Sequence, residues 1–185
     1  MSISPVNNQR SFVLFWELLG VIPIALAGAM LHFAFEWSGE WRPLAVFAAV
    51  NESVWEHMKL AFWPAVAWAL LGRCLRPDAT LCYWFAKSLG LLMMPLVMGG
   101  LFYAYTAALG RNLLWADITI FVVAIFVGQA TAAGLLLYLR KTGFRVVAGG
   151  FLLAVQLVAF SLFTYMPPHM PLFEETRSGV YGIPP

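Results

Sequence analysis

Runs of about 20 mostly apolar residues recur along the whole chain, and this repetition limits the possible folds more than any other feature. A helix needs about 20 residues to cross the roughly 30 Å of hydrocarbon in a bilayer. The runs cover approximately residues 12–36, 52–72, 80–108, 113–139 and 146–166. We therefore predict an all-α integral membrane protein, built as a bundle of about five transmembrane helices.

The overall composition excludes a soluble globular fold. Of the 185 residues 62% are hydrophobic and 11% are charged, and the interior of a soluble domain of this size is too small for so much apolar surface. Because no internal repeat or polar domain interrupts the runs, we predict a single transmembrane domain over residues 1–185. Residues 167–185 form its C-terminal tail, and 43–50 are too short to cross and predict a re-entrant or interfacial segment.

The distribution of Lys and Arg between the predicted loops indicates the orientation. One side carries six of them: Arg10, Arg73, Arg76, Arg140, Lys141 and Arg145. The other side carries three: Arg42, Arg111 and Arg177. The positive-inside rule then predicts an inner (plasma) membrane protein with a cytoplasmic N-terminus and an extracytoplasmic C-terminus. A net charge of +2 without a basic run gives no indication of a nucleic-acid partner.

Polar residues concentrate at the predicted extracytoplasmic end. The segment "VNESVWEHMKL" at 50–60 contains several charges directly before an apolar run. The only three histidines of the sequence map to this end: His32 closes the first span, His57 opens the second and His169 lies in the tail. This clustering predicts a shared polar site.

The residue types predict a metal site. His32 and Glu36 are four residues apart, which places them on one helical face. Imidazoles and carboxylates are ligands for Zn²⁺, or for iron or manganese. We predict His32, Glu36, His57 and His169 as ligands of a divalent metal ion, with zinc as the first choice.

Neighbouring residues predict catalytic roles around that metal. Zinc lowers the pKa of a bound water to roughly 7, and a carboxylate can then act as general base or acid. We assign this role to Glu52 or Glu56, and we assign Ser53 as an orienting hydrogen-bond donor. The sequence thus predicts a metal-dependent hydrolase of a lipid or amphipathic substrate.

Structural explanations remain open for the same residues. The stretch from Ser53 to Glu56 matches the capping box S-x-x-E, and Glu56 lies three residues before Lys59, within pairing distance on a helix. His32 fits an interfacial histidine, and His169 fits an ordinary loop residue.

A second function also remains open: a non-enzymatic membrane protein, either an accessory subunit of a larger complex or a small-solute carrier. Gly- and Ala-rich stretches such as "VGQATAAG" and "VVAGG" are typical of helix faces that contact another helix, and so fit a membrane-protein partner. Deeper in the bundle Glu17 and Lys87 predict an ion pair, either as a clamp between helices or as one end of a proton or solute path.

Three motifs carry a resemblance to a known family. "HFAFEWSG", "NESVWEHMKLAFWP" and "YMPPHMPLFEETRSGVYGI" occur in an order that resembles a family of uncharacterised prokaryotic polytopic membrane proteins. That resemblance implies five or six helices and no defined activity. The residue types are also similar to the metallohydrolase superfamily of alkaline ceramidases and adiponectin-type receptors, which implies zinc held by three histidines. The chain lacks the H-x-x-x-H pair and the seven spans of that superfamily.

Overall fold

The computed structural model describes residues 5–75, 82–139, 142–175 and 178–183. These residues form helices joined by turns, with one isolated β-bridge between Glu174 and Tyr181. The helices are α1 (Pro5–Leu19), α2 (Val21–Trp37), the 3₁₀ helix η1 (Arg42–Val46), α3 (Val54–Leu75), α4 (Tyr83–Leu109), α5 (Leu114–Tyr138) and α6 (Gly143–Tyr165). The predicted all-α class is confirmed.

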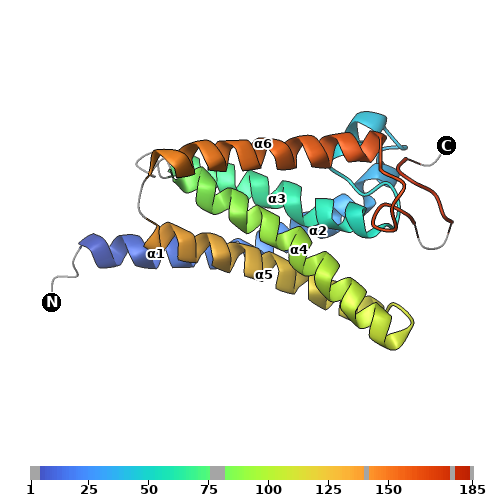
Figure 1. Ribbon diagram of the computed structural model, residues 1–185, viewed down its shortest axis with the longest axis horizontal. Helices are drawn as coiled ribbons and strands as arrows, with labels where there is room; N and C mark the ends of the chain where they lie inside the picture. Colours follow the sequence, from blue (N-terminus) through green and yellow to red (C-terminus); the bar gives the residue numbers. More distant parts are fainter. Residues whose placement is uncertain (1–4, 76–81, 140–141, 176–177, 184–185) are drawn as a thin grey trace.

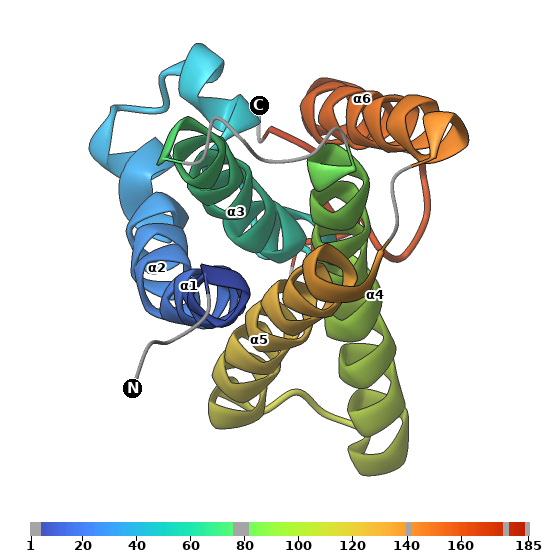
Figure 2. The ribbon, with the colours of Figure 1, turned by 90° about the vertical axis from the view of Figure 1, so that its left-hand side faces the viewer.

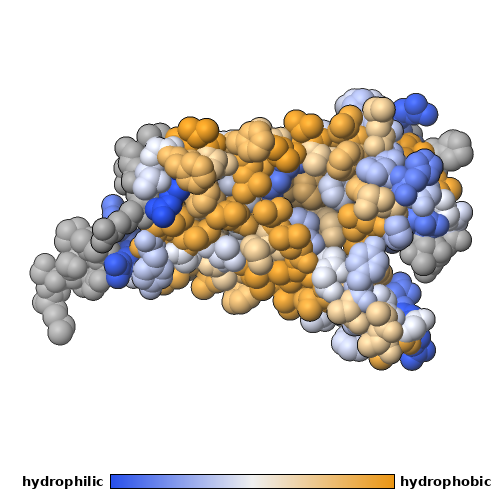
Figure 3. Space-filling view, viewed as in Figure 1, coloured by the Kyte–Doolittle hydropathy of each residue, from blue (hydrophilic) through white to orange (hydrophobic). Residues whose placement is uncertain are grey.

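Within the described part of the chain, five stretches are long and apolar enough to cross a membrane: Gln9–Trp37, Val54–Leu75, Tyr83–Leu109, Leu114–Tyr138 and Gly143–Tyr165. They follow the five predicted spans closely, because length and apolar content alone fix such segments. Figure 3 shows hydrophobic side chains over the middle of the visible face and hydrophilic ones mainly at its two ends. This banding is the pattern of a multi-pass membrane protein.

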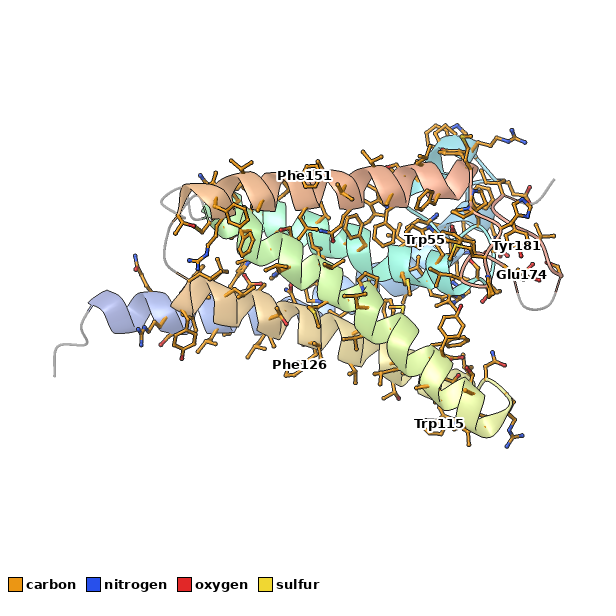
Figure 4. All side chains as sticks on the ribbon, viewed as in Figure 1. Trp55, Trp115, Phe126, Phe151, Glu174 and Tyr181 are labelled. Carbon is orange, nitrogen blue, oxygen red and sulfur yellow. The ribbon has the colours of Figure 1, made fainter. Side chains whose placement is uncertain are left out.

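The long helices run roughly side by side along the long axis of the molecule (Figure 1). Figure 2 shows them end on, with α4 next to α5 and α6, and α2 next to α3. The far ends of α4 and α5 leave the bundle together as a hairpin, whose tip carries Trp115 (Figure 4). The same end of the bundle carries, on the side away from the hairpin tip, the start of α3, helix η1 and the C-terminal tail (Figure 1).

Glycines allow close helix contacts inside the bundle. A β-carbon on Gly90 would lie 2.6 Å from the carbonyl oxygen of Gly128, and one on Gly149 would lie 2.5 Å from the backbone of Phe85. Such distances are too short for any side chain. Gly128 and Gly149 belong to the Gly-rich stretches that were predicted to fit a membrane-protein partner. These stretches are therefore used in part to pack α4 against α5 and α6 inside the protein.

The predicted deep ion pair is confirmed. Lys87 of α4 donates to the carboxylate of Glu17 in α1, and both side chains are 2% exposed. Gln129 of α5 donates to the backbone oxygen of Glu17 at 3.1 Å. Three helices thus meet at one satisfied polar cluster, as buried charges require.

The C-terminal tail is tied to the start of α3. The Asn51 amide donates to the carbonyl of Gly182 at 2.8 Å, and the backbone N–H of Trp55 donates to Leu172 at 3.0 Å. The Trp55 ring stacks on Phe160 of α6 and contacts Phe173 of the tail. These contacts hold the tail over the end of the bundle (Figure 4).

The tail also contains its own polar contact. The Tyr181 hydroxyl donates to Glu174 at 2.9 Å, beside the isolated β-bridge that joins the same two residues (Figure 4). This hydrogen bond raises the pKa of the Tyr181 phenol above its usual value, because ionisation would place a second negative charge next to the carboxylate.

The chain order puts Arg10, Arg73 and Arg145 at one end of the bundle and Arg42 and Arg111 at the other. The predicted orientation also rests on four basic residues that lie outside the described residues: Arg76, Arg140, Lys141 and Arg177. The direction of insertion stays a prediction.

Candidate metal centre

His32, Glu52 and His57 come together at the tail end of the bundle. His32 lies near the end of α2, His57 lies in the first turn and a half of α3, and Glu52 lies just before α3. One possible ligand atom from each of the three lies within 4.8 Å of the other two. The two imidazole rings are 5.3 Å apart between their centroids. Helix α2, helix α3 and the segment before α3 therefore each supply one potential ligand to the same point.

The distances suit a shared ion better than hydrogen bonds. His32 Nε2 lies 3.6 Å from Glu52 Oε1, and His57 Nε2 lies 3.5 Å from Glu52 Oε2. These separations are too long for good hydrogen bonds. Two ligands at 2.0–2.2 Å from a tetrahedral zinc ion are roughly 3.4 Å apart, so each separation between a histidine and Glu52 is close to that of two zinc ligands, while the three atoms together lie within 4.8 Å of one another.

The backbone orients the His57 ring. Its Nδ1 lies 2.8 Å from the carbonyl oxygen of Ser53. A carbonyl can only accept, so Nδ1 carries a hydrogen, and Nε2 is the ring nitrogen that faces Glu52. A backbone carbonyl that orients one ring nitrogen is the usual outer partner of a metal-binding histidine. Without a proton or a cation at Nε2, the lone pair and the carboxylate would repel each other.

The three side chains are open to solvent on one side. Their exposed fractions are 27% for His32, 36% for His57 and 51% for Glu52, so an ion and a water could both reach them. On the protein side, His32 Nδ1 is buried and has no hydrogen-bond partner among the described residues. The site is thus a shallow one at the surface of the bundle.

Glu56, which was expected to act as base or acid, lies elsewhere. Its carboxylate is 2% exposed, pairs with Lys59 Nζ at 2.6 Å and accepts from the N–H of Val50 at 3.0 Å. Lys59 also donates to the carbonyl of Ala45 and to Thr164. The structural alternative, a Glu56–Lys59 pair, is confirmed, and both charges are satisfied inside the protein.

Ser53 caps α3 through its side chain and contacts His57 only through its backbone. The N–H of Glu56 donates to Ser53 Oγ at 3.4 Å, which is the first half of the expected capping box. The second half is missing: the N–H of Ser53 donates to Asn51 Oδ1 instead of to Glu56. Among the described residues, the Ser53 hydroxyl makes no hydrogen bond to either histidine.

The remaining predicted residues do not join the three-residue group. Glu36 is exposed one turn beyond His32 on α2, and His169 is exposed in the tail with its ring 4.7 Å from that of Tyr181. His169 therefore belongs to the tail, while Glu36 stands beside the group without contacting it.

Sequence reasoning did not anticipate the contact of Asn51 with the tail. This residue is 9% exposed, and it links the start of α3 to the tail through Ser53 and Gly182. Asn directly before a helix start is itself the available signal, since its side chain readily bonds the backbone two residues on. Asn51 fixes the segment that carries Glu52.

A family model matches residues 6–183, nearly the whole chain. The chain belongs to DUF6512, a family of unknown function. No curated protein and no solved structure matches it. Membership in DUF6512 agrees with the resemblance to an uncharacterised family seen in the three motifs, and it brings no activity or site residue with it.

Proposed function

We propose that this protein binds a divalent metal ion, zinc in the first instance, through His32, Glu52 and His57. The observation that supports this most is the convergence of two imidazole nitrogens on one carboxylate, with the His57 ring oriented by Ser53. Three protein ligands leave a fourth position for water, which is typical of catalytic zinc sites. Relative to the sequence-based prediction, Glu52 takes the place of Glu36 and His169 as a ligand.

The reaction class that this donor set favours is metal-assisted hydrolysis of a lipid or amphipathic ester or amide. Zinc supplies a water that ionises near neutral pH. Glu36 is the second carboxylate close to the site along the helix, and we assign it as proton acceptor. Water can reach the three ligands from their exposed side. The membrane-spanning helices below the ligands contact the bilayer, from which a substrate can reach the site.

We place this site at the extracytoplasmic face of the inner membrane. Lys and Arg are in excess in the loops at the opposite end, and the positive-inside rule assigns that end to the cytoplasm. A substrate would then approach from the outer leaflet.

Elemental analysis of the full-length protein, purified in detergent and dialysed against metal-free buffer, tests the proposal. Wild type should retain about one zinc per chain after addition of zinc, and His57→Ala and Glu52→Gln should each lower the affinity more than about ten-fold. Two exposed controls from the same end, His169→Ala and Glu40→Gln, should bind as wild type does. Helix content by circular dichroism separates lost binding from lost folding. Failure of folded wild type to hold zinc, iron or manganese would refute the proposal.

A second candidate is an accessory subunit of a membrane complex. The observation that favours it is the outer face of α6, where Phe144, Phe151 and Val158 are exposed and Gly150 has open space before it (Figure 4 labels Phe151). A neighbouring helix can approach such a face closely. Cross-linking in native membranes from Phe151 tests it: a discrete partner supports this candidate, and cross-links to lipid alone reject it.

A further inference from the structure

An apolar groove of about 720 Å³ runs along the outside of the bundle between α2 and α3. Residues 27–37 of α2 and 63–70 of α3 form its walls, and Leu44 and Phe47 of the connecting segment line the end beside η1. Met30 and Leu70, both from the walls, are more than half exposed, so the groove is open along its side. In a membrane this open side faces the hydrocarbon.

Two hydrogen bonds, one buried and one exposed, hold η1 at this end of the groove. Helix η1 is only five residues long, yet Lys59 donates to its Ala45 carbonyl at 2.6 Å. On its outer side the Tyr165 hydroxyl donates to the carbonyl of Arg42 at 2.9 Å. The Lys59 side chain is fully buried, so its hydrogen bond to η1 is shielded from water. The groove is thus a formed feature and not a gap between loosely packed segments.

The length of the groove matches one leaflet of a bilayer. From Trp37 to Ala27 there are ten residues of α2, or about 15 Å at a rise of 1.5 Å per residue. That is half of the roughly 30 Å hydrocarbon thickness. Trp37 lines the end of the groove beside η1, and Trp41 directly precedes η1; Trp is favoured at the interface between lipid and water. One acyl chain of a single leaflet therefore fits the groove along its length.

A basic residue, Arg42, lies at the interfacial end of the groove. Arg42 is the first residue of η1, two positions before Leu44 of the lining, and it is exposed. Guanidinium groups bind phosphate with two parallel hydrogen bonds. We propose that the groove is a binding site for one anionic phospholipid, with an acyl chain between α2 and α3 and its phosphate at Arg42.

This lipid is distinct from any substrate of the metal centre. Leu31 belongs to the groove, whereas His32 is one residue on, about 100° around the helix. His32 lies on the same face as Gly28, four residues earlier, and Gly28 packs against Leu60 and Phe121 inside the bundle. The groove and the metal centre therefore open on different sides of α2, and the lipid proposal does not depend on the metal.

Native mass spectrometry of the detergent-purified full chain tests the proposal. Synthetic phosphatidylglycerol and phosphatidylcholine with identical acyl chains are the probes. Wild type should retain one phosphatidylglycerol at a concentration about five- to ten-fold lower than phosphatidylcholine. Arg42→Gln should abolish this preference, while Arg111→Gln, at the hairpin tip of the same end, should keep it. Glu40→Gln should strengthen it, since a carboxylate two residues before Arg42 is removed.

A second variant tests the acyl-chain half independently. Ala67→Phe places a ring in the groove and should reduce retention of both lipids, whereas Ala154→Phe on the outer face of α6 should leave retention unchanged. His57→Ala should retain lipid as wild type does, which separates this site from the metal centre. Equal retention of the two lipids by wild type, or unchanged preference in Arg42→Gln, would show annular lipid only and overturn the proposal.

Discussion

Gly28 of α2 packs directly on the backbone of Leu60 in α3: a β-carbon on Gly28 would lie 2.6 Å from the Leu60 carbonyl oxygen. His32 is one turn further along α2, and His57 is three residues before Leu60 on the antiparallel helix. The close approach of the two helices at Gly28 therefore sets the spacing of the two imidazoles.

Gly28→Ala should weaken metal binding although it touches no ligand. The added methyl group must push α2 from α3, because backbone cannot move aside as a side chain can. We expect a loss of affinity of more than about ten-fold and a destabilisation of about 1–3 kcal/mol. Zinc titration and thermal unfolding measure the two effects.

The matched control is Gly150→Ala, since a β-carbon there meets nothing within 4 Å. Ala has the higher helix propensity, so this variant should be as stable as wild type or slightly more stable. If Gly28→Ala binds zinc as Gly150→Ala does, the helix contact does not position the site.

Ser53→Ala should lower stability and leave metal binding intact. The hydroxyl caps α3, and losing a cap costs about 1 kcal/mol. His57 is held by the backbone carbonyl of Ser53, which the substitution retains. Denaturant unfolding and zinc titration on the same sample check both statements. A loss of zinc as large as in His57→Ala would instead give the hydroxyl a direct role.

Glu17→Gln and Lys87→Met should each destabilise the protein more than the double variant does. Removing one partner strands a buried charge, at about 3–5 kcal/mol, whereas removing both strands none. A double-mutant cycle from unfolding in detergent gives the coupling. Simple additivity would mean that the pair contributes no interaction energy.

Thiol labelling of native Cys74 and of an Arg111→Cys variant should reveal the orientation of the protein in the membrane. Cys74 is exposed near the end of α3, at the end of the bundle opposite Arg111. In intact cells an impermeant thiol reagent should label the introduced cysteine and spare Cys74, because the positive-inside rule places Cys74 in the cytoplasm. Cys82 is buried and serves as an internal unreactive thiol. The reverse labelling would move the metal centre to the cytoplasmic side.

The sequence identified where polar residues gather but not which of them meet. His32 and His57 were predicted to converge, and they do, since both lie at adjacent ends of antiparallel helices. Glu52 and Glu56 share a helical spacing, so no pattern separated them. Only the packing shows that Glu56 turns inward to Lys59 while Glu52 turns to the histidines.

Number, length and order of the membrane-crossing helices were determined by the sequence alone, because a bilayer demands a fixed length of apolar chain and little else. The Glu17–Lys87 pair was predictable for a related reason: a charge within a span needs a partner, and the chain offers few. The roles of Glu52, Asn51 and η1 were decided by tertiary structure. Each depends on contacts between residues distant in the chain, such as Lys59 with Ala45 and Asn51 with Gly182, and local spacing does not encode such contacts.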